Sequence, residues 1–187
     1  MHVTQLSAPI RPATLPWDDP HGCLPPTASG VLQVAMGQVK IGVGNDRLQA
    51  LLGSCVGIAL IWKKQGRCAL AHCLLPETAD MTELPCARYV SQAVPSLLRL
   101  LGASVADYAE LEVIVAGGAT MLNGCSSRLQ IGQQNADAAR RHLRKFGLNI
   151  SYCRVGGKSG RTLHIDCATC DYTVQDIVHP CPGVVHA

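Results

Sequence analysis

The sequence predicts a mixed α/β sandwich in a single folded domain. Short apolar runs with the period of β-strands alternate with two segments of helical period, and the strands are joined by hairpin turns rather than by regular βαβ repeats. The chain has 187 residues, of which 48% are hydrophobic and 16% are charged. This composition is too apolar for a disordered chain and sufficient for one core. We therefore expect the folded domain to span residues 31–178.

The two ends of the chain are expected to lie outside this domain. Six of the eleven prolines stand between positions 9 and 26. Proline fixes its own φ and lacks a backbone N–H, so this density excludes helix and sheet alike. We expect a flexible leader over residues 1–30 and a loose, proline-broken tail over residues 179–187.

The first half of the domain is expected to be β-structure. Residues 31–43 alternate apolar and polar side chains in two short runs, as half-buried strands do, and a turn follows at residues 44–46. The apolar stretches 48–62 and 67–75 flank the polar turn KKQG. This arrangement predicts a β-hairpin, which Pro76 ends.

The second half is expected to alternate helices and strands. Apolar side chains at helical spacing predict a helix over residues 86–101 that ends at Gly102 and contains Pro95. A buried strand is expected at residues 111–116, before the turn at Gly117-Gly118. The later elements are expected to be a helix over 133–146 ended by Gly147, and strands near 149–155, 161–166 and 172–177.

Composition and local patterns exclude several functions. The net charge is only +3 and the chain has seven aromatic residues, which argues against a nucleic-acid binder. The basic residues of 140–145 are typical of the solvated face of a helix. Gly117-Gly118 is not followed by Lys-Ser or Lys-Thr, so a phosphate loop is not indicated. The N-terminus has no pattern of a signal peptide, and the nearly uncharged run 48–62 is shorter than the roughly 20 residues of a spanning helix, so we expect a cytoplasmic protein.

Ten cysteines are spread through apolar stretches, as expected for reduced cytosolic thiols rather than for a disulfide scaffold. Cys167 and Cys170 form one C-x-x-C pair, with Cys153, His164, His179 and Cys181 near in sequence. Zinc ribbons use two such pairs, so buried thiols are the favoured interpretation and a small zinc protein is an alternative.

The segment Leu52-Gly53-Ser54-Cys55 is the strongest candidate for chemistry. A Gly-Ser turn before a cysteine places backbone N–H groups beside a sulfur, which is what a nucleophile with an oxyanion hole requires. His72 follows seventeen residues later. Gly53 and Ser54 are therefore candidate oxyanion donors, Cys55 a candidate nucleophile and His72 its candidate base.

The expected hairpin tests whether this pair can meet. If the hairpin turns about Lys64 and Gln65, His72 lies opposite Gly57, and Cys55 is its diagonal neighbour on the same face at roughly 7–8 Å between backbones. Gly57 would leave room there for a substrate. A shift of one residue would place the two side chains on opposite faces. The alternative is that Cys55 is a packing residue and His72 a hydrogen-bonded core histidine.

Five motifs in order resemble the CheD family of chemoreceptor glutamine deamidases: LGSCVGIALIW, ALAHCLLP, AGGATML, IGQQNADAARRHLRKFGL and VGGKSGRTL, across residues 34–174. The resemblance implies two mixed β-sheets flanked by helices, similar to toxin-type cysteine deamidases. It also implies a cytoplasmic chemotaxis enzyme that converts glutamines of methyl-accepting chemoreceptors to glutamates, with Cys55 as nucleophile, His72 as general base and no metal or cofactor. The implied partners are the receptors, through which alone it meets the membrane, and a CheC-type phosphatase.

The sequence departs from the family at one position. The family commonly has a threonine six residues before the cysteine, where this chain has Gln49. The Gln49 amide oxygen can accept a hydrogen bond, so Gln49 is a possible third catalytic residue beside His72. The other outcomes are that a different neighbour orients His72, that activity is weaker, or that the chain is a non-catalytic adaptor for receptors or a CheC-type phosphatase.

Overall fold

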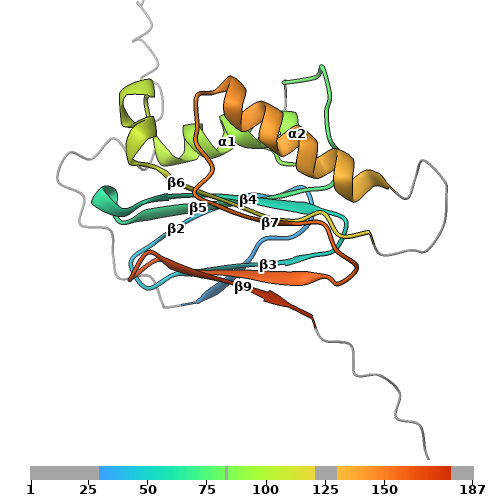
Figure 1. Ribbon diagram of the computed structural model, residues 1–187. Helices are drawn as coiled ribbons and strands as arrows, with labels where there is room; N and C mark the ends of the chain where they lie inside the picture. The colour runs from blue at the N-terminus through green and yellow to red at the C-terminus, as the bar shows by residue number, and fades with distance from the viewer. Residues whose placement is uncertain (1–29, 83, 121–129, 178–187) are drawn as a thin grey trace, which may run out of the picture.

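The computed structural model describes residues 30–82, 84–120 and 130–177, and it consists of two stacked β-sheets with two helices on the outer face of one sheet (Figure 1). The expected tail, and the expected leader apart from Gly30, lie outside these residues. Both sheets are mixed, since each contains one parallel pair of strands. The predicted mixed sandwich is therefore confirmed.

The five-stranded sheet has the order β2-β5-β4-β6-β7 and is antiparallel except for the pair β6-β7. Its central strand, β4, is buried along its whole length because it is covered on both faces. The strands are β2 (Val39–Val43), β4 (Val56–Trp62), β5 (Arg67–Cys73), β6 (Glu112–Gly117) and β7 (Tyr152–Val155).

The four-stranded sheet has the order β1-β3-β8-β9, with β1 parallel to β3. Strand β3 alternates buried and more exposed residues, as a sheet with one solvated face requires. The strands are β1 (Val31–Gln33), β3 (Arg47–Leu52), β8 (Arg161–Asp166) and β9 (Asp171–Asp176).

Two apolar layers hold the elements together. One lies between the five-stranded sheet and the helices α1 (Val90–Leu101) and α2 (Ile131–Lys145). The other lies between the two sheets, where side chains such as Leu48, Leu52 and Ile114 are wholly buried. Short 3-10 helices follow β4 and α1, at η1 (Lys63–Gln65) and η2 (Val105–Glu110).

The elements follow the sequence expectations with two corrections. The stretch 48–62 is not one strand of a hairpin, because residues 53–55 carry the chain from β3 in one sheet to β4 in the other. The first helix begins at Val90 rather than at residue 86, since Tyr89 is extended and forms an isolated parallel bridge with Leu75. Pro95 lies inside α1, and Gly102 ends it in the left-handed conformation, as expected.

In the part of the chain that the structure describes, no helix combines the length and the apolar character needed to cross a membrane.

Candidate active site

The register of β4 and β5 brings the predicted pair to one face. Gly57 lies opposite His72, and Val56 lies opposite Cys73 at the end of the ladder, as the hairpin expectation requires. Cys55, the next residue outward, packs against the core between the two sheets. His72 faces the same layer, because it shares a face with Gly57. The two side chains thus lie at the edge of the inter-sheet layer, where the chain crosses between sheets.

His72 is held in one orientation by the backbone. Its side chain is 4% exposed, and Nδ1 lies 3.0 Å from the carbonyl oxygen of Val34. A carbonyl can only accept, so Nδ1 carries the proton and Nε2 of the neutral ring carries the lone pair. Nε2 is buried and has no hydrogen-bond partner within the described residues. Burial lowers the pKa of His72 and the bond to Val34 opposes that shift, so the ring is a neutral base at pH 7.

Cys55 is half-buried and neutral in this arrangement. Burial raises the pKa of the Cys55 thiol, and its own backbone N–H partly opposes the shift. No hydrogen bond joins its sulfur to His72 among those found in the described residues. The thiol therefore becomes a nucleophile only when a base removes its proton.

The turn at residues 53–55 directs its carbonyl groups into the protein. In chain order, its three carbonyl oxygens accept from Ala119 N at 2.8 Å, Asn135 Nδ2 at 3.1 Å and Gly118 N at 2.7 Å. Its N–H groups donate to no backbone acceptor in the described ranges. Such N–H groups beside a thiol are the donors that an oxyanion hole needs.

Gly117 packs against the turn at residues 53–55. Its φ is +105°, a conformation that favours glycine, and a Cβ on it would collide with the carbonyl oxygen of Cys55. Gly118, at φ +64°, donates its N–H to that same oxygen. The Gly117-Gly118 pair thus lets the end of β6 approach Cys55 closely.

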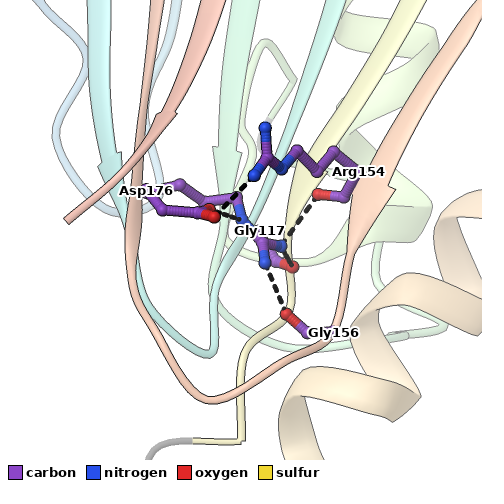
Figure 2. Close-up of polar contacts among 5 residues, drawn as sticks. Gly117, Arg154, Gly156 and Asp176 are labelled. Carbon is purple, nitrogen blue, oxygen red and sulfur yellow. Dashed lines mark hydrogen bonds and ion pairs between the residues drawn. The ribbon is translucent and has the colours of Figure 1, made fainter. Parts of the chain in front are cut away.

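Arg161 holds the end of β6 in place through hydrogen bonds of its guanidinium group (Figure 2). Its side chain is 6% exposed, and Nη1 donates to the carbonyl oxygens of Gly117 and Arg154, at 2.9 Å each. Nη2 donates to Gly156 O at 2.7 Å, and Nε to Asp176 at 3.0 Å. One buried guanidinium thus connects β6, β7 and β9 next to the turn at residues 53–55.

The expectation of a contact between the Gln49 side chain and His72 is wrong. Leu48 and Ala50 of β3 are wholly buried between the sheets, so Gln49 lies on the outer face. There it lines a cavity of about 370 Å³ with Arg47, His164 and Tyr172, among others. Position 49 acts through its backbone instead: its carbonyl oxygen accepts from Val34 N at 2.7 Å, and the Val34 carbonyl orients His72.

The expectation that Gly57 leaves room for a substrate is also wrong. A Cβ at Gly57 would lie 2.8 Å from Leu52 Cδ1 and 3.5 Å from Leu163 Cδ2. The space beside Gly57 is filled by the opposite sheet. Gly57 therefore permits close packing of the two sheets at this point.

Cys167 and Cys170 are 2% and 7% exposed and lie in the inter-sheet core. The sulfur of Cys170 is 4.0 Å from that of Cys68 on β5. Within the described ranges no group of three or more His, Cys, Asp or Glu residues is placed to hold a metal ion, and Cys153 is exposed elsewhere. The interpretation as buried thiols is confirmed for this pair, while His179 and Cys181 lie outside the described residues.

Sequence reasoning missed two residues of the site, Val34 and Asn135. Val34 gives no signal, because only its backbone carbonyl takes part. Asn135 gives one: it is a polar residue on the apolar face of α2, among the buried residues Ala136, Ala139 and Leu143. A buried polar side chain in such a position needs hydrogen-bond partners.

Comparisons with known proteins identify one family. The family described as CheD chemotactic sensory transduction matches residues 74–176. A protein of Bdellovibrio bacteriovorus named "Probable chemoreceptor glutamine deamidase CheD" is 41% identical over 146 residues, which are 77% of this chain and 93% of that protein. Proteins of the same name from Methanococcus vannielii and Pyrococcus horikoshii are 34% and 37% identical. They cover 78% and 74% of this chain, and the matches cover 94% and 87% of their own lengths.

Proposed function

Because the chain belongs to the CheD family of chemotactic sensory transduction proteins, we propose that it hydrolyses glutamine side chains of chemoreceptors to glutamate and ammonia. The names of its relatives supply the reaction and the substrate. The observation that carries the proposal here is the β4–β5 register, which puts Cys55 and an imidazole with an unpartnered Nε2 on one face. The catalytic unit is then residues 31–178.

The first step is activation of the thiol. Burial raises the pKa of Cys55 and lowers that of His72, so both groups are neutral before substrate arrives. His72 Nε2 takes the proton from Sγ as the sulfur attacks the side-chain carbonyl carbon of glutamine. The Val34 carbonyl, hydrogen-bonded to Nδ1, then stabilises the imidazolium that forms.

The second step is collapse of the tetrahedral intermediate. Its oxyanion is held by N–H groups of residues 53–55, where loss of one such donor typically costs about a hundredfold in rate. The imidazolium gives its proton to the departing nitrogen, the C–N bond breaks and ammonia leaves. Cys55 is then joined to the substrate as a thioester.

The third step is hydrolysis. The neutral imidazole accepts a proton from water, and the resulting hydroxide attacks the thioester carbonyl in the same oxyanion hole. The C–S bond breaks, and the thiolate recovers the proton from His72. Each cycle consumes one water, releases ammonia and leaves a glutamate. These steps use only groups of this chain and require no metal or cofactor.

The partners follow from the family. We propose a cytoplasmic protein that meets the membrane only through its receptors and that also binds a CheC-type phosphatase. A non-catalytic adaptor with the same partners is the alternative. The missing threonine at position 49 favours this alternative. The orientation of Gln49 argues against it, since the Gln49 side chain faces away from His72 while its carbonyl oxygen accepts from Val34 N.

Mass spectrometry of a purified receptor cytoplasmic fragment, incubated with the protein or with Cys55→Ala, tests the proposal. We expect mass gains of about one dalton at specific glutamines with the wild type alone, since amide hydrolysis replaces NH₂ by OH. Gains with both proteins would contradict a role for Cys55. Binding of the fragment without any gain would identify an adaptor.

A further inference from the structure

The β4–β5 hairpin opens at the residues that carry the chemistry. Its ladder ends at Val56 and Cys73, and the next pair outward, Cys55 and Leu74, is directed elsewhere. Leu74 N donates to Arg88 O at 3.1 Å, and Cys55 O accepts from Gly118 N. The nucleophile therefore lies just beyond the last rung of the ladder, where strand pairing no longer fixes its distance from His72.

A side chain of α2 bridges this opening. Asn135 is wholly buried, and its Nδ2 donates to Leu74 O at 2.9 Å and to Ser54 O at 3.1 Å. Both protons of the amide nitrogen are thus used. The two carbonyl oxygens also fix the orientation of the amide. If Oδ1 were turned toward them, three oxygen acceptors would face one another with no proton between them. Oδ1 itself has no partner among the described residues.

The bond to Ser54 also determines where the next N–H points. The carbonyl of Ser54 and the N–H of Cys55 belong to one peptide unit, and in a trans peptide these groups point in opposite directions. Binding the carbonyl toward α2 directs the Cys55 N–H away from α2. That N–H is one of the donors which the oxyanion requires.

We propose that Asn135 is a positioning residue that holds the peptide before Cys55 to the end of β5, so that the thiol faces His72 and the Cys55 N–H faces the oxyanion. The inference rests on the proposed function for its kinetic part. Two donors on one short, rigid amide suit this role, since serine offers one donor and aspartate at neutral pH offers none. The hydrogen bonds found for Asn135 among the described residues go to Ser54 and Leu74, so we expect it to act through these two residues.

The test compares Asn135→Ala with Ser96→Ala. Ser96 is an equally buried polar residue on α1, and its hydroxyl lies 2.8 Å from Cys86 O and 2.7 Å from Gln92 O. Both variants lose a buried hydrogen-bonding side chain from the helix layer. We expect Asn135→Ala to lower kcat for receptor deamidation about a hundredfold, the cost typical of one oxyanion donor, with KM changed far less. Ser96→Ala is expected to keep wild-type kcat.

A second measurement does not depend on deamidation. The pH dependence of Cys55 alkylation by iodoacetamide, followed by peptide mass spectrometry, reports the thiol's surroundings. In Asn135→Ala the loosened turn exposes the thiol, so the midpoint is expected to move to lower pH, toward the ordinary pKa. Ser96→Ala should not move it. If Asn135→Ala does not fold, Asn135→Ser, which keeps one hydrogen-bond donor, replaces it in both measurements. Its alkylation midpoint should shift in the same direction.

The outcomes separate the two proposals. Equal losses of kcat in the Asn135 and Ser96 variants, or an unmoved alkylation midpoint in both, would overturn the positioning role. If the wild type itself fails to deamidate the receptor, the proposed function fails. The alkylation profile then still decides on Asn135: a shift in its variants alone supports the proposal.

Discussion

The inter-sheet layer holds cysteines at both of its ends, and the two ends differ in the groups that surround the sulfur. Cys68 and His72 stand four residues apart on the same face of β5, about 13 Å at the rise of a strand. Cys68 meets Cys170 and packs among apolar side chains. The contact with Cys167, together with burial, raises the pKa of the Cys68 thiol. Cys55, at the other end, shares a face with the imidazole of His72, and the N–H groups of residues 53–55 donate to no backbone acceptor in the described structure. The neighbours of each cysteine, rather than the residue type, therefore distinguish the two ends.

The largest expected effect is the loss of activity in Cys55→Ala. Without the sulfur no thioester forms, so ammonia release from a receptor fragment should fall to background. Cys68→Ala, the matched change at the other end, should keep at least about half of the wild-type rate, because a buried site this far away leaves transition-state binding unchanged. Equal losses in both variants would mean that Cys55 is only a packing residue.

The next effect is the pH dependence that His72 confers. Burial lowers the pKa of His72 below its ordinary 6.5, so the ring stays able to accept a proton until the pH falls below that value. We expect kcat/KM to decline on acidification only below about pH 6.5. His72→Gln should lower kcat about 10²- to 10⁴-fold and remove this acid limb. An acid limb that survives in the variant would assign it to another group.

The same shift affects stability in a defined direction. Because the pKa of His72 is lower in the folded protein than in the unfolded chain, the unfolded chain binds the proton more readily. The contribution of His72 to the free energy of unfolding is therefore fully present above about pH 6.5 and is lost as the pH falls below that value. Chemical denaturation of the wild type and His72→Gln at several pH values measures the contribution. The free energy of unfolding should change less with pH in His72→Gln than in the wild type.

A smaller effect, on thermal stability, is expected at the Cys68 end of the inter-sheet layer. Cys68→Ala removes one buried sulfur and should cost about 1 kcal/mol, as does deletion of one buried methyl group. A thermal transition about 3 °C lower would show it. Cys153→Ala is the control, since Cys153 is exposed. An unchanged transition in Cys68→Ala would mean that the sulfur contributes no packing.

The smallest effect is expected at position 49. Gln49→Thr restores the family's usual residue on a face that points away from His72, so kcat should change by less than about twofold. Ammonia release at saturating receptor fragment measures it. A tenfold gain would show that the side chain at position 49 affects the reaction and that Gln49 weakens the activity of the wild type.

The hairpin was predictable because a short turn fixes the register of two uniformly apolar strands. The orientation of Gln49 was not. In a continuous strand over 48–62, Gln49 would share a face with Cys55. The turn at residues 53–55 instead carries the chain between facing sheets, so even-numbered residues point inward in β3 and odd-numbered ones in β4.

The remaining contacts of the site span long separations. The Val34 carbonyl meets His72 across 38 residues, and Asn135 reaches Ser54 and Leu74 across 81 and 61. Local patterns carry no information on such distances. The sequence predicts the candidate nucleophile and its candidate base, whereas the contacts that support them depend on the tertiary structure.

Most of those supports are main chain: the Val34 carbonyl orients the imidazole, the Gln49 carbonyl holds Val34, and the turn offers peptide N–H groups. The surroundings of Cys55 and His72 therefore depend more on the path of the main chain than on the identity of individual side chains. Grafting only a cysteine and a histidine onto another hairpin would transfer the two side chains without the main-chain groups that surround them here. Grafting the whole crossover between the sheets, with the end of β6 and its two glycines behind it, would transfer both.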